Sequence, residues 1–163
     1  MIRSNTILAG IFVAALGVVA GTTSQAATSP FRAMAGSWTG GGMISMANGE
    51  QERLRCRASY NVAGAGDALN LDLRCASPSY RFDLTSQAEY RGGEISGSWS
   101  EASRNASGSL SGSANGDHIE VAARGQNFAA DLSLTTRGSR QSISIRPQGQ
   151  SDIRGVSLAL ERH

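Results

Sequence analysis

The chain has 163 residues, a formal net charge of +2 and only 17% charged residues, while glycine occupies 20 positions. Such a length suffices for one domain with a single buried core. The near balance of charge argues against nucleic-acid binding, which depends on a strongly basic surface.

Residues 1–26 have the layout of a secretory signal peptide. Arg3 lies in a short n-region, an apolar run extends from Ile7 to Ala20, and Ser24-Gln25-Ala26 provides a cleavage site. The run of about 14 residues is too short for a membrane-spanning helix, which needs roughly 20. We therefore expect cleavage after Ala26 and no transmembrane span in the mature chain.

The export signal and the basic residues together indicate a bacterial protein that is periplasmic or secreted. No Cys follows the apolar run, so a lipoprotein-type acylation site is missing. All 15 basic residues are Arg, which we interpret as codon bias of a GC-rich genome. Selection for bidentate anion binding is the alternative interpretation.

The mature chain divides into an N-terminal segment at 27–35, expected to be a loop or one helical turn, and a single domain at 36–163. Apolar and polar residues alternate through this domain, without a helical period longer than two turns, which predicts an all-β fold. Short connections make neighbouring strands antiparallel. The expected strands are Gly36–Met46, Glu52–Val62, Ala68–Cys75, Tyr80–Tyr90, Glu94–Ser100, Gly108–Ala114, Asp117–Ala123, Asn127–Thr135, Gln141–Arg146 and Gly155–Arg162.

Strands in meander order leave two economical ways to hide the edges of the sheet. The sheet can close into an antiparallel up-and-down β-barrel of about 8–10 strands, or it can stack on itself as a β-sandwich. We expect the barrel and keep the sandwich as the alternative.

Turn residues predict the register of two hairpins. Asn115-Gly116 tolerates positive φ at both positions, which favours a type I′ turn with Gly112 opposite Ile119. Arg91-Gly92-Gly93 joins two strands so that Ala88 lies opposite Gly97.

Cys56 and Cys75 are the only cysteines. If Val62 pairs with Leu69 across the Gly-rich loop between them, Cys56 lies directly opposite Cys75, at a distance that a disulfide can bridge. An exported chain meets an oxidising compartment, so we expect a structural disulfide that stabilises the fold by about 3 kcal/mol.

Catalytic chemistry is not visible in the sequence. His118 and His163 are the only histidines, and no serine has an evident base beside it. The cysteines and histidines do not match the spacing of metal ligands. We therefore expect no catalytic residue, no metal, no cofactor and no enzymatic activity.

Two sets of residues are candidates for binding. Inward-facing aromatic side chains would line a lumen for a small apolar ligand, unless the Gly- and Ala-rich inner face packs solid. They are Trp38, Tyr60, Tyr80, Phe82 and Trp99. Outward-facing arginines are either neutralised by Asp72 and Asp83 or available to an anion or an acidic partner. They are Arg53, Arg55, Arg57, Arg74 and Arg81.

Gly36-Ser37-Trp38 opens the first expected strand and resembles the Gly-x-Trp motif of lipocalin-like (calycin) β-barrels. The resemblance implies a barrel in which Trp38 lies beneath an arginine of the last strand, either Arg154 or Arg162. It also implies binding of a small apolar molecule.

The function expected from the sequence is that of a non-enzymatic periplasmic β-barrel which binds a small apolar or amphipathic ligand. The alternative is a protein-interaction module, such as an enzyme inhibitor or an envelope-associated factor. It would act through its loops or through the outward-facing arginines. Neither hypothesis specifies an oligomeric state.

Overall fold

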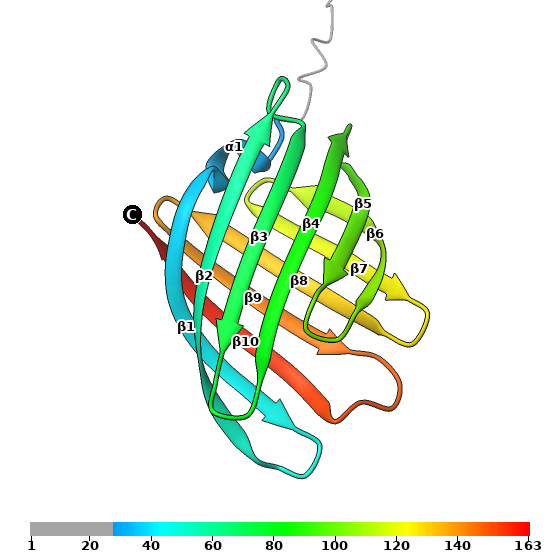
Figure 1. Ribbon diagram of the computed structural model, residues 1–163. Coiled ribbons are helices and arrows are strands. Elements are labelled where there is room, and N and C mark those ends of the chain that lie inside the picture. The colour runs from blue at the N-terminus through cyan, green and yellow to red at the C-terminus, as the bar shows by residue number, and fades with distance from the viewer. Residues whose placement is uncertain (1–27) are drawn as a thin grey trace, which may run out of the picture.

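The computed structural model describes residues 28–163, which form one short helix and ten strands (Figure 1). The expected signal peptide lies outside the described residues. Every predicted strand is present, and its ends differ from the prediction by no more than two residues. The elements are α1 (Phe31–Met34), β1 (Gly36–Met46), β2 (Gln51–Ala63), β3 (Ala68–Ala76), β4 (Arg81–Arg91), β5 (Glu94–Glu101), β6 (Ala106–Asn115), β7 (His118–Gly125), β8 (Ala129–Arg137), β9 (Arg140–Pro147) and β10 (Ile153–Arg162).

The ten strands form one closed antiparallel barrel. Each strand pairs with its neighbours in sequence, and β1 also pairs with β10 through Trp38–Arg162 and Ile44–Val156. Closure leaves no free sheet edge among the described strands. The prediction of an up-and-down barrel is therefore confirmed.

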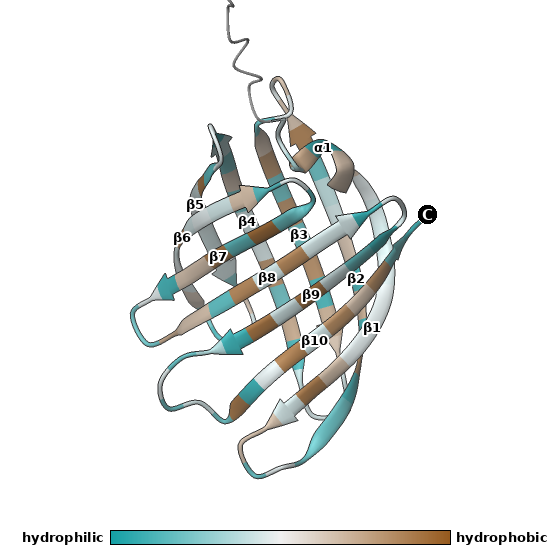
Figure 2. Cartoon of the chain, turned by 180° about the vertical axis from the view of Figure 1, so that it is seen from behind, coloured by the Kyte–Doolittle hydropathy of each residue, from teal (hydrophilic) through white to brown (hydrophobic). Residues whose placement is uncertain are grey.

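The strands β2–β4 form one side of the barrel, and β7–β10 cross behind them (Figures 1 and 2). Glycines occur where the wall turns between these sides. A Cβ added at Gly42 of β1 would collide with the Ser157 carbonyl of β10, and one at Gly108 of β6 with the Arg124 carbonyl of β7. Glycine permits this close approach of neighbouring backbones. Several of the small inward residues are therefore required by the close packing of neighbouring strands.

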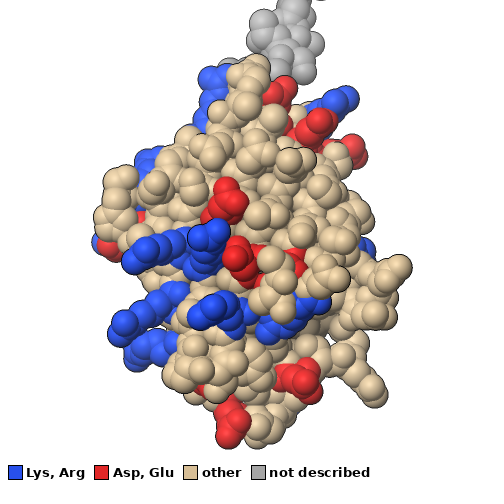
Figure 3. All heavy atoms as spheres, in the orientation of Figure 1, with Lys and Arg blue, Asp and Glu red and all other residues tan. Residues whose placement is uncertain are grey.

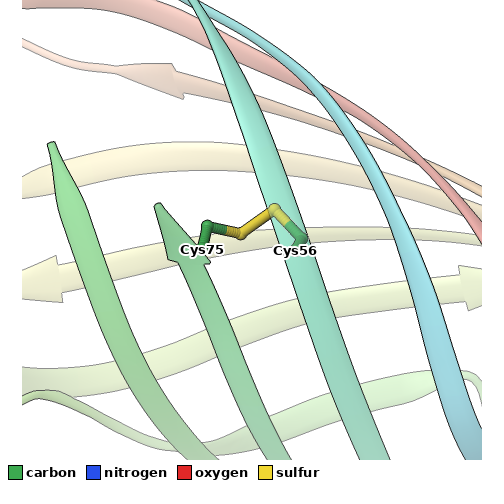
Figure 4. The surroundings of a disulfide bond; sticks show 2 residues. All are labelled: Cys56 and Cys75. Atoms are coloured by element: carbon green, nitrogen blue, oxygen red, sulfur yellow. A yellow bond between two sulfur atoms is a disulfide. The ribbon is translucent and has the colours of Figure 1, made fainter. Parts of the chain in front are cut away.

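The register predicted for β2 and β3 is confirmed, since Val62 pairs with Leu69 and Cys56 with Cys75. The two cysteines form a disulfide with their Cα atoms 4.1 Å apart (Figure 4). Both are buried, so the bond lies on the inner side of the wall.

The predicted register of β4 and β5 is also confirmed, with Ala88 opposite Gly97. Gly92 and Gly93 form the loop, and both have positive φ. A two-residue type I′ turn requires this combination.

The β6–β7 turn lies one residue later than predicted. Asn115 pairs with His118, which puts Gly112 opposite Val121 instead of Ile119. Of the two loop residues only Gly116 has positive φ, at 61°, so the type I′ prediction is wrong. Glycine in the first loop position suits a type II′ turn, where only that residue needs positive φ. The pairing differs by two residues, so each side chain keeps its face.

We expect Gly42→Ala to lower the free energy of unfolding by about 2 kcal/mol, because the added methyl forces β1 and β10 apart. Gly155→Ala is the matched control in the same ladder, since its Cβ would lie 3.5 Å from the Ile145 carbonyl oxygen, an ordinary contact. Urea denaturation followed by circular dichroism measures both variants. Equal stability of the two variants would show that the close approach at Gly42 carries no cost.

Candidate functional site

One end of the barrel is sealed by α1. Phe31 and Met34 of this helix are buried at 1% and 2% exposure. The indole Nε1 of Trp38 donates a hydrogen bond to the Met34 carbonyl at 2.7 Å, and the ring of Phe31 packs edge-on against Tyr90. The helix therefore acts as a plug, held from two sides of the wall.

Arg162 completes the seal from the last strand. Its guanidinium lies 5.2 Å from the centre of the Trp38 ring. It also donates hydrogen bonds to the carbonyls of Ala33, Ala35 and Gly138, which join α1 to the β8–β9 loop. Of the two candidate arginines, Arg162 is the one that covers Trp38.

A buried polar chain crosses the sealed end. Tyr60 Oη donates to Gln141 Oε1 at 2.7 Å, and Gln141 Nε2 donates to Thr136 Oγ1 at 3.0 Å. Burial raises the pKa of the Tyr60 hydroxyl far above its ordinary value, so this residue stays protonated. Trp38 and Tyr60 pack edge-on here, so two of the five candidate lining residues belong to the sealed end.

Farther from the plug, several inward apolar side chains of β3–β8 are only partly buried, although Leu73, Trp99 and Ala130 on the same strands are buried. By contrast, Ile44 of β1, Leu54 of β2 and Leu158 of β10 are almost fully covered. The interior is thus packed along one part of the wall and accessible to solvent along another. The partly exposed inward apolar residues of these strands include Leu71, Phe82, Leu84, Leu110, Val121, Leu132 and Leu134.

Small side chains explain why the wall from β5 to β8 remains accessible. Leu110 lies between Gly97 and Ala123 in register, and Ala123 pairs with Ala130. These neighbours project little into the interior, so no large side chain lies directly opposite Leu110 on either adjacent strand. The spacing of Gly and Ala in the sequence indicates that the inner face carries small side chains, but only the register shows that these residues lie side by side.

Trp99 is the main aromatic residue on this wall. It is 6% exposed, and its ring packs edge-on against Phe128 at a centroid distance of 5.4 Å. A Cβ at Gly125 would lie 3.0 Å from Cζ2 of the indole, so the ring rests on β7 because that position is glycine. Phe128, expected within a strand, lies instead in the β7–β8 loop and is 37% exposed.

The indole Nε1 of Trp99 is buried without a hydrogen-bond partner, the single such side-chain atom in residues 28–163. An indole N–H can only donate, and a buried donor without an acceptor costs about 1–3 kcal/mol. The site therefore offers an apolar wall with one unused donor.

Glu101 holds the β5–β6 loop at the end of the barrel away from α1. Its carboxylate accepts hydrogen bonds from the backbone N–H groups of Asp83, Ser103 and Arg104. Burial alone raises the pKa of Glu101, but these bonds and the nearby Arg104 together lower it below its ordinary value. Arg104 in turn lies 4.8 Å from the centre of the Phe82 ring. Tyr80 is half-buried in the β3–β4 loop, at this same end of the strands.

We expect Glu101→Gln to be less stable than the wild type by about 2 kcal/mol at neutral pH, because hydrogen bonds to a charged acceptor are lost. The pKa in the folded state lies below the ordinary 4.5, so the wild-type advantage is complete above pH 4.5 and disappears as the pH falls through the folded-state value. Urea denaturation of both proteins at a series of pH values measures this difference in the free energy of unfolding. An advantage that persists unchanged in strong acid would contradict the assignment.

The candidate arginines all lie exposed on the outer face of β2–β4 (Figure 3). Arg57 pairs with Arg74 in register, as predicted. Asp83 lies 3.3 Å from Arg74 Nε, whereas Asp72 forms no ion pair with any described residue. One of the two expected neutralising carboxylates therefore fulfils that role.

Within residues 28–163, no cluster of three or more His, Cys, Asp or Glu side chains could hold a metal ion. The His118 ring contacts Thr135 Oγ1 at 2.9 Å and Glu120 Oε1 at 3.3 Å. None of the helices in the same range has the length and apolar character needed to cross a membrane.

Searches against protein families and against curated proteins found no match. Among solved structures, Rv2717c from M. tuberculosis is similar with a TM-score of 0.61 and 17% identity, over 83% of this chain and 94% of that one. An S-type phycobiliprotein lyase, CPES from Guillardia theta, is similar with a TM-score of 0.54 and 12% identity, over 82% and 89%. Identities this low show the fold alone. The chain is an all-β protein whose closed antiparallel barrel is lipocalin-like in fold.

Proposed function

We propose that the protein binds a small apolar or amphipathic ligand inside the barrel, along the wall from β5 to β8, and that it is not an enzyme. The observation that carries this proposal is the contrast within the interior. The end beneath α1 is packed, whereas inward apolar side chains such as Leu110 and Leu84 remain partly exposed. Partly exposed apolar surface inside a concave wall is typical of a ligand site.

The unpartnered Trp99 Nε1 specifies part of the ligand's chemistry. A ligand with an apolar body and one hydrogen-bond acceptor would cover Leu110 and accept from the indole N–H. Phe128 lies edge-on to Trp99 and is partly exposed, so the apolar surface continues into the β7–β8 loop. An amphipathic molecule could keep its polar end at that loop.

A role in binding instead of catalysis is supported by the side chains around Trp99. The nearest inward hydroxyl in register is Ser86, which donates to the Ser98 carbonyl at 2.9 Å. Among the described residues, neither histidine lies on an inward position of this wall. The inward hydroxyl nearest to Trp99 is therefore without a histidine base beside it. One neighbour in fold is named as a lyase, but that name describes the neighbour and not this chain.

Location in the periplasm or outside the cell is part of the same proposal. The layout of residues 1–26 is that of an export signal, and the Cys56–Cys75 disulfide fits an oxidising compartment. No nucleic-acid partner is proposed.

The test is native mass spectrometry of the protein purified from its own compartment, together with titration by the dye 1-anilinonaphthalene-8-sulfonate. We expect one small molecule in the native spectrum and saturable dye binding. Leu110→Trp should weaken dye binding at least about tenfold, because the larger ring fills the space in front of the wall. Ser111→Trp is the matched control, since it places the same ring on the outer face of β6.

A second variant tests the donor. Trp99→Phe keeps an aromatic ring and removes the N–H, so a ligand with an acceptor should bind about fivefold more weakly. The proposal is wrong if the native spectrum shows a bare chain and the dye does not bind. Those results would favour the protein-interaction alternative instead.

A further inference from the structure

The outer face of β2–β4 carries a groove of about 480 Å³ that the ligand site inside the barrel does not use (Figure 3). Its lining includes Arg55, Arg57, Arg74 and Arg81, with a single carboxylate, that of Asp83. A basic groove stands out in a chain of near-neutral charge.

The register shows how the groove is built. Arg55 of β2 pairs with Ala76 of β3, and Ala76 pairs with Arg81 of β4. Adjacent strands lie about 4.8 Å apart, so the two arginines are separated by about 10 Å at the backbone with only a methyl group between them. The hollow is therefore the space above Ala76, with a long cationic side chain on each side.

The next row of outward residues adds charge at one end of the hollow. Arg57 lies directly opposite Arg74, and like charges in this position repel. Arg74 pairs with Asp83, but the side chains of Arg55, Arg57 and Arg81 have no ion pair or hydrogen bond among the described residues. Three guanidinium groups thus remain available to an external anion.

The disulfide lies directly behind this cluster. Cys56 stands between Arg55 and Arg57 on β2, and Cys75 stands between Arg74 and Ala76 on β3. Because the side chains of a strand alternate between faces, the covalent bond inside joins the two strands that carry Arg55, Arg57 and Arg74 outside (Figure 4). The cross-link restricts the backbone beneath the groove, which lowers the part of the entropy cost of binding that comes from backbone motion.

We propose that this groove is a binding site for phosphate-bearing anions. Guanidinium groups offer several N–H donors in a planar fork that matches the oxygens of a phosphate, and more than one arginine suits a multiply charged group. The phosphate belongs either to a soluble compound or to the headgroup of an anionic lipid.

Two probes distinguish these sources. Inorganic pyrophosphate, titrated by calorimetry at low ionic strength, tests the shared chemistry. Flotation with phosphatidylglycerol vesicles, compared with phosphatidylcholine vesicles, tests the lipid source. Binding of pyrophosphate alone supports the groove with a soluble ligand, and binding of both probes supports a lipid headgroup.

Paired variants connect the binding to the groove. We expect Arg55→Gln/Arg81→Gln to weaken pyrophosphate binding about tenfold or more, because both flanking donors are lost. Arg146→Gln/Arg154→Gln removes the same charge from exposed positions of β9 and β10 and should leave binding unchanged.

Ala76→Leu tests whether anion binding needs the hollow itself or only the positive charge around it. It keeps every arginine and fills the space between Arg55 and Arg81, so it should also weaken binding about tenfold. Circular dichroism and thermal unfolding confirm that each variant is folded. The proposal is overturned if neither probe binds, if the Arg146/Arg154 variant loses binding equally, or if Ala76→Leu and Arg55→Gln/Arg81→Gln bind as the wild type does.

Discussion

The ladder between β1 and β10 joins the first strand of the domain to the last, from Trp38–Arg162 to Ile44–Val156. Without these hydrogen bonds the sheet would have two free edges, and its two faces would not become an inside and an outside. The same pairing places Arg162 next to Trp38, where it donates hydrogen bonds to the carbonyls of Ala33 in α1 and Ala35 directly after it. Closure of the wall and sealing of one end are thus produced by the same pair of strands.

Much of this architecture follows from local sequence patterns. Alternation of apolar and polar residues predicted all ten strands, and the loop after Val62 predicted the register that brings Cys56 opposite Cys75. These predictions succeed because side-chain alternation and short turns are local properties. The prediction for the Asn115-Gly116 turn was wrong because Gly116 occupies the first loop position, which is determined by the pairing of β6 with β7.

The candidate sites were less accessible to sequence reasoning. Trp38 and Tyr60 looked equivalent to Trp99 as inward aromatic residues, yet contacts with α1 and Gln141 place them in a packed end. Those contacts join residues distant in sequence, and no local pattern reports them. Likewise, Ala76 became part of a groove only once β4 was known to place Arg81 beside it. The candidate interior site lies along β5–β8 and the exterior groove on β2–β4 of the same closed sheet, and the disulfide joins β2 to β3 behind the groove.

The central claim is that the interior is open at Leu110 and closed at Leu160, and thiol labelling of the folded protein tests it directly. Leu110→Cys and Leu160→Cys each add one inward thiol, the first at a partly exposed position and the second at a position 1% exposed. Reaction with a small maleimide under native conditions, followed by mass spectrometry, should be fast at position 110. At position 160 it should require unfolding. Equal protection of both thiols would mean that the interior is packed throughout, and the account of a ligand site along β5–β8 would be wrong.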